Sequence, residues 1–135
     1  NAGNVNVKVT DVVDIAGVNN QFASGIRSLV DIGTEGQAGN ITIDSGTFKL
    51  RSGALLSAAT FGKGNAGNVT VNAKDSIFLT GNSYIFSTVE AGGIGKGGNI
   101  DIIANSLSLT DGASLLTATR QASESQPAGQ GSAGN

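Results

Sequence analysis

Carboxylates are the side chains of this sequence with the greatest potential for catalysis. The chain has ten Asp and Glu residues in 135 and contains no His and no Cys. Carboxylate chemistry on polysaccharides requires two acids on one face, about 5–9.5 Å apart. On the internal repeat described below, no two acids fall at equivalent positions of adjacent units: Asp44 is level with Lys8, Asn72 and Ile103, and Asp101 with Asn6, Thr42 and Thr70. We therefore predict no catalytic residues and no enzyme activity.

Glycine-rich segments match two phosphate-binding patterns but lack the context that these patterns need. Residues 93–98 contain a GxGxxG match, and residues 62–64 read Gly-Lys-Gly. Neither segment precedes a helical pattern and no Ser or Thr follows the lysine, so the helix dipole and the metal partner are both missing. Residues 92–95 also begin like a calcium-binding nonapeptide, but Lys96 and Gly97 stand where that motif needs Asp. We interpret these segments as turns and predict no cofactor and no metal site.

The charge and hydropathy of the chain exclude two classes of partner. The net charge is −2, and the eight Lys and Arg residues and six aromatic residues are scattered. Nucleic-acid binding requires a clustered basic surface, usually with stacking aromatic residues. No stretch approaches the 18 or so consecutive apolar residues of a membrane-spanning helix. We predict neither nucleic-acid binding nor membrane insertion.

A Gly–Asn step followed by alternating aliphatic residues recurs along the chain. Its asparagines are Asn4, Asn40, Asn68, Asn99 and Asn135, at spacings of 36, 28, 31 and 36 residues. In a stack of repeats these side chains would form a ladder at one corner, where each amide satisfies backbone groups of a tight turn and is engaged inward. The alternative is that the ladder binds a polar ligand. Asn40 and Asn68 also begin glycosylation sequons, which we interpret as coincidental.

Each unit contains two further short alternating segments. In units two to four, a turn corner at Gly53, Asn82 and Gly112 follows the second segment by three residues. Gly and Asn enter the left-handed backbone region at low cost, which favours a corner there. Unit one fits the same pattern once five residues are inserted near residues 17–22. Alternation of period two is typical of strands with one buried face, and such a unit buries that face by stacking on copies of itself.

These patterns predict an all-β fold, a right-handed, three-faced parallel β-helix of four coils of about 28–36 residues. The coils are residues 4–39, 40–67, 68–98 and 99–134, in a single domain over residues 1–135. Both ends of the sequence lie inside the repeat motif. We therefore expect a segment of a longer solenoid, or a piece that stacks end to end on identical chains.

The repeat resembles that of large filamentous-haemagglutinin-like exoproteins, the cyanobacterial ones in particular. The match is closest over residues 50–68 (LRSGALLSAATFGKGNAGN) and recurs at residues 97–100 (GGNI) and 109–113 (LTDGA). The sequence departs from the family pattern at residues 120–132, which replace a short turn, and at the insertion in unit one. The amino-terminal secretion domain of such exoproteins is not part of this sequence.

The resemblance implies two-partner secretion and a long β-helical shaft at the bacterial cell surface. The function we expect is a structural shaft segment of a secreted, adhesin-like exoprotein, which would present a receptor-binding region to a cell surface or matrix. Its partners would be neighbouring coils of the same or an identical chain. A self-assembling extracellular fibre subunit and a polysaccharide-processing β-helix enzyme are the alternatives.

Overall fold

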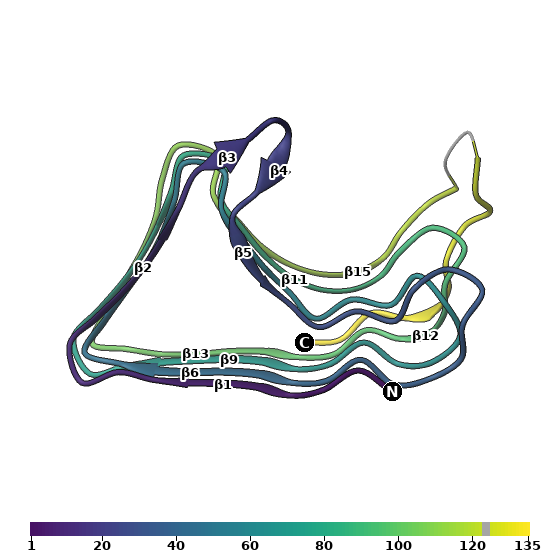
Figure 1. Ribbon diagram of the computed structural model, residues 1–135, viewed down its shortest axis with the longest axis horizontal. Coiled ribbons are helices and arrows are strands. Elements are labelled where there is room, and N and C mark those ends of the chain that lie inside the picture. The colour runs from purple at the N-terminus through teal and green to yellow at the C-terminus, as the bar shows by residue number, and fades with distance from the viewer. Residues whose placement is uncertain (123–124) are drawn as a thin grey trace.

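The computed structural model describes residues 1–122 and 125–135, and within these ranges every regular element is a β-strand. Three parallel sheets form the three faces of a solenoid, each with one strand from each coil (Figure 1). Sheet one contains β1 (Val5–Lys8), β6 (Ile41–Ser45), β9 (Val69–Ala73) and β13 (Ile100–Ile103). Sheet two contains β2 (Val12–Ala16), β7 (Thr47–Arg51), β10 (Ser76–Thr80) and β14 (Ser106–Leu109). Sheet three contains β5 (Gly25–Arg27), β8 (Leu55–Ser57), β11 (Tyr84–Val89) and β15 (Ser114–Thr119).

The register of the three sheets agrees with the alignment of the repeat. Val5, Ile41, Val69 and Ile100 occupy one column of sheet one. The two further alternating segments of each unit form sheets two and three, and they also lie level from coil one to coil four. One column of sheet two contains Val13, Phe48, Ile77 and Leu107, and one of sheet three contains Ile26, Leu56, Ile85 and Leu115. The predicted three-faced parallel β-helix is therefore confirmed. In the described ranges, no helix is long and apolar enough to cross a membrane.

The direction of the amide groups sets the hand of the solenoid. The inward-facing residues Val5, Ile41 and Val69 each donate their N–H to the following coil, to the carbonyl of the asparagine before the next strand, at 2.9 Å. The chirality of Cα couples the direction of a side chain to the direction of its own N–H in an extended strand. Inward side chains with forward-pointing N–H groups correspond to a right-handed helix, as the sequence predicted.

The core is a set of aliphatic columns along the solenoid axis. Ile41, Phe48 and Leu56 of coil two are fully buried. The equivalent residues of the first coil are only partly buried. In the last coil Ile100 and Leu115 are partly buried and Leu107 is 45% exposed, because each end coil has a neighbouring coil on one side alone. Burial at about 25 cal/mol per Å² of apolar surface is the main stabilising contribution to such a stack.

Differences in coil length are confined to a few turns. Coil one carries an antiparallel hairpin, β3 (Val18–Asn19) and β4 (Phe22–Ala23), at the predicted insertion. Residues 120–132, which replace a short turn of the repeat, end in a strand: β16 (Gln130–Ser132) pairs in parallel with β12 (Ile94–Lys96). β16 thus brings coil four back into alignment with coil three before the Gly134–Asn135 step. Residues 123 and 124 of that segment lie outside the described residues.

Candidate functional site: the glycine–asparagine edge and the outer recesses

The repeated asparagines form a hydrogen-bonded ladder along one edge of the solenoid. The side-chain Oδ1 of each asparagine accepts a hydrogen bond from the backbone N–H of the asparagine one coil further on. The four distances, from Asn4–Asn40 through Asn40–Asn68 and Asn68–Asn99 to Asn99–Asn135, are 2.8, 2.8, 2.9 and 3.1 Å. All five residues are exposed, so these amides are not engaged inward as expected. The ladder hydrogen-bonds coil to coil at the surface.

A second ladder runs beside the first and was missed by the sequence analysis. Oδ1 of Asn1 accepts from the N–H of Gln37 (2.8 Å), Oε1 of Gln37 from that of Asn65 (3.0 Å), and Oδ1 of Asn65 from that of Lys96 (2.9 Å). These residues lie three positions before the main asparagines. The signal that could have revealed them is the amide side chain at this position in three successive units, although Gln in place of Asn obscures it.

The glycine of every Gly–Asn step after the first is required by the approach of the neighbouring coil. A Cβ at Gly67 would overlap the carbonyl oxygen of Gly39, and a Cβ at Gly98 would overlap that of Gly67. Gly39 and Gly134 stand in the same relation to the coil before them. Backbone atoms meet at this edge, so no side-chain rotamer could relieve the overlap.

The predicted turn corner lies between sheets two and three. Gly53, Asn82 and Gly112 have φ values of +80°, +54° and +80°. Each has a neighbour that also has positive φ, and the corners of adjacent coils are hydrogen-bonded, for example from the N–H of Gly53 to the carbonyl of Gly81 at 2.7 Å. The left-handed region expected at this corner is present in all three coils.

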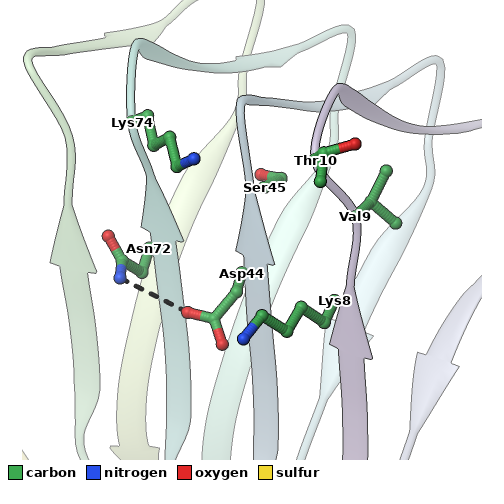
Figure 2. A pocket seen from close by; sticks show the side chains of 7 residues that line it. All are labelled: Lys8, Val9, Thr10, Asp44, Ser45, Asn72 and Lys74. Carbon is green, nitrogen blue, oxygen red and sulfur yellow. Dashed lines mark hydrogen bonds between the residues drawn. The ribbon is translucent and has the colours of Figure 1, made fainter.

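One recess lies on the outer face of sheet one, near the corner with sheet two (Figure 2). Lys8 and Lys74 lie on opposite sides of it, and the Lys8 side chain extends toward Asp44. Oδ1 of Asp44 accepts a hydrogen bond from Nδ2 of Asn72 at 3.3 Å. Asp44 is the one carboxylate of this recess, so it lacks the second acid that glycoside chemistry would need.

Other exposed acids are paired with cations of the adjacent coil. Nε of Arg51 donates to Oδ1 of Asp14 at 2.9 Å and its Nη2 donates to Oδ2 at 3.0 Å. This hydrogen bonding holds the pKa of the Asp14 carboxyl below its ordinary value of 3.8, so the group is ionised at neutral pH. Lys63 pairs with Glu35 at 2.9 Å. Exposed pairs of this kind contribute little to stability and offer no general acid.

No cluster that could hold a metal ion occurs among the described residues, where no three His, Cys, Asp or Glu residues converge. Comparison with protein-family models, curated proteins and solved structures found no match. The resemblance to filamentous-haemagglutinin-like exoproteins is therefore carried by the repeat residues alone and stays a prediction. The geometry itself identifies a parallel β-helix whose most regular feature is its glycine–asparagine edge.

Proposed function

We propose that this chain is a structural shaft segment of a secreted, cell-surface, adhesin-like exoprotein. The observation that carries the proposal is the uninterrupted asparagine ladder, in which every coil is hydrogen-bonded to the next at the same edge. Each coil contacts only its neighbours, as in other solenoids, so coils can be added without changing the existing ones. An architecture of this kind supplies length and stiffness, which are the properties of a shaft.

The interior and the surface support a structural role. The buried core contains aliphatic side chains and small hydroxyl residues, with one Phe. The acids of the described surface stand singly or in ion pairs across coils. Repetition with little chemical variety is what a spacer requires. Cell-surface location and secretion rest on the family resemblance described above.

The proposal is tested by joining copies of the chain in register. Asn135 already occupies the ladder position that Asn4 would take in the following coil, so Asn135 of one copy can replace Asn4 of the next. Small-angle X-ray scattering of one, two and three joined copies should show a rigid rod that lengthens by ~19 Å per copy, at about 4.8 Å for each of four coils. Copies that behave as separate particles on a flexible string would contradict the proposal.

A matched control uses the same fusion with one extra residue at the join. A shift of one residue turns the inward side chains of a strand outward, so this fusion should not form a continuous rod.

Location can be tested separately, with antibodies against the folded chain applied to intact cells of the source bacterium. Labelling of intact cells is expected, and labelling that requires lysis would exclude the surface role.

A further inference from the structure

A groove on the outer face of sheet three combines aromatic, aliphatic, hydroxyl and charged side chains. It encloses about 320 Å³. We call it the aromatic groove and define it by its lining residues, Arg27, Leu29, Leu55, Ser57, Phe61, Phe86, Glu90 and Arg120. In Figure 1, the strands of sheet three and the turns that follow them bend between the β3–β4 hairpin and the segment after β15.

The register of the coils makes this groove run along the solenoid axis. Arg27, Ser57 and Phe86 share an outward-facing column of sheet three and form one wall. Phe61, Glu90 and Arg120 form the other wall. Each donates its N–H to a carbonyl of the preceding coil that lies three residues after the column of the first wall, namely that of Val30, Thr60 or Val89. Between the walls, Thr88 is fully buried and Ala59 is 1% exposed, although alternation directs both outward. These two residues form the floor of the groove. The backbone bends here, so that their outward-facing side chains are covered.

Aromatic and charged groups are held in fixed positions at one end of the groove. The Phe86 ring stacks on Tyr84 with centroids 5.4 Å apart. Cζ of Arg120 lies 5.6 Å from the Phe86 centroid, and Nε of Arg120 pairs with Glu90 at 3.1 Å. The hydroxyl of Thr88 in turn donates to Glu90. The charge of Arg120 is therefore neutralised by Glu90 within the groove. The Phe86 ring is held by contacts with the Tyr84 ring and the Arg120 guanidinium.

At the other end of the groove, the guanidinium of Arg27 has no acidic partner among the described residues. Nη2 of Arg27 makes a long hydrogen bond, 3.4 Å, to the carbonyl of Ala23. Among the described residues, the ion pairs involve Arg51, Lys63 and Arg120 but not Arg27. Beside Arg27 lie the apolar side chains Leu29 and Leu55, with Phe61 across the groove. This end thus combines apolar surface with an available positive charge.

This combination favours a sugar polymer over a peptide. An extended peptide in the groove would need hydrogen bonds for its backbone, but the free edges of sheet three lie at the two ends of the solenoid and not along the groove. A pyranose ring has an apolar face of C–H groups and carries its hydroxyls around the rim. It can pack on Phe61 and Leu55 while its polar groups reach solvent and Ser57. A carboxylate on the sugar would complement Arg27.

We propose that the aromatic groove binds an extended, uronate-containing polysaccharide, with sugar rings against Phe61 and Leu55 and a carboxylate on Arg27. The polymer would lie along the solenoid axis across successive coils. This site does not depend on the shaft role, because the groove is complete within the four coils described. It assigns a ligand class to a surface that otherwise has no structural explanation.

The experiment is a titration of the 135-residue chain with oligogalacturonate of defined length. Tyr84 is the single tyrosine and the chain has no tryptophan, so its emission reports on the groove through Phe86, the lining residue on which it stacks. A saturable change in emission is expected, matched by calorimetry. The fully methyl-esterified oligomer, which has the same rings without charge, should bind roughly tenfold more weakly, because a charge-assisted hydrogen bond is lost.

Three variants locate the site. Arg27→Gln should weaken binding of the acidic oligomer roughly tenfold and abolish its preference over the ester, and Phe61→Ala should weaken both oligomers. Phe78→Ala removes another exposed aromatic ring, on the outer face of β10 in sheet two, and should leave binding unchanged. Circular dichroism of each variant verifies the fold. Absence of saturable binding, equal losses in Phe78→Ala, or competition by a proline-rich peptide in place of sugar would overturn the proposal.

Discussion

Each of the three inner Gly–Asn steps, at Asn40, Asn68 and Asn99, meets two separate requirements of the stack. The glycine lets the backbone of one coil pass close to the carbonyl of the previous coil, and the asparagine oxygen accepts the amide N–H that arrives there. The sequence showed the asparagine column because the residue repeats. It did not show that the amides face solvent, nor why glycine precedes them, since both follow from the approach of coils that lie 28 to 36 residues apart in the chain.

Substituting the glycine should cost more at an inner coil than at the first. In Gly67→Ala the new Cβ would overlap the backbone of Gly39, and the coils must separate to accommodate it. We expect a loss of about 3 kcal/mol in the free energy of unfolding, measured by denaturant titration. Gly3→Ala is the matched control, because the same position in the first coil has nothing within 4 Å. Similar losses for both variants would show that conformational freedom, and not the contact, is what this position requires.

Burial predicts opposite outcomes for two residues of coil two. Leu56 is fully buried in a column of sheet three, so Leu56→Asp places an unpaired charge in an apolar interior and should cost about 4 kcal/mol or unfold the chain. The side chain of Lys63 is 64% exposed and pairs with that of Glu35, which is 73% exposed. Lys63→Ala should therefore change stability by less than about 1 kcal/mol. Thermal melts compare the two, and equal losses would be inconsistent with the burial of this column.

At the scale of elements, alternation predicted the strands and their register because the same signal occurs in every coil. The hairpin of coil one was predicted only as an insertion, because a feature present once leaves no repeated pattern. For the same reason β16 was missed: its residues Gln130–Ser132 are polar and small, and they are strand only because β12 lies beside them. Local composition favoured a loop, and pairing with the neighbouring coil overrode it.

The extra residues of coil four should be removable as a block. Arg120 and Gly129 are joined by a hydrogen bond from the N–H of Gly129 to the Arg120 carbonyl, and they correspond to Phe61 and Gly62 in the shorter coil two. Deleting residues 121–128 would therefore recreate the coil-two turn. Circular dichroism should show the native β-sheet spectrum, with a melting temperature within a few degrees.

Deleting β16 serves as the control for that experiment. Loss of Gln130–Ser132 removes the pairing with β12 and places the next Gly–Asn step out of register, so this variant should be clearly destabilised. If the block deletion is as damaging as the loss of β16, the removed residues contribute packing that the short turn cannot replace.

At the scale of the whole molecule, the end coils of the stack leave exposed the apolar side chains that the inner coils bury. Leu107 and Leu109 of coil four are 45% and 39% exposed, whereas Ile77 and Leu79 at the same positions of coil three are 0% and 1% exposed. Strand edges with free backbone groups surround these apolar side chains, and such edges pair readily with other strands. Stacking of a second chain on this end would repeat the contact that coil four makes with coil three.

The last four residues obstruct that contact in the 135-residue chain. Asn135 already lies on Asn99, and Ser132–Asn135 together fill the place that Asn1–Asn4 of an incoming chain would need. A chain of residues 1–131 should therefore self-associate more strongly than the full sequence, because Asn1–Asn4 of the second copy can take over the contacts that were removed. Light scattering at increasing concentration should give a rising mass for residues 1–131 and a smaller rise for the full chain. Leu109→Asp in the shortened chain places a charge on the exposed end face and should restore a monomer. If the full and shortened chains associate equally, the two segments do not compete for one position and stacking in register is not how these ends meet.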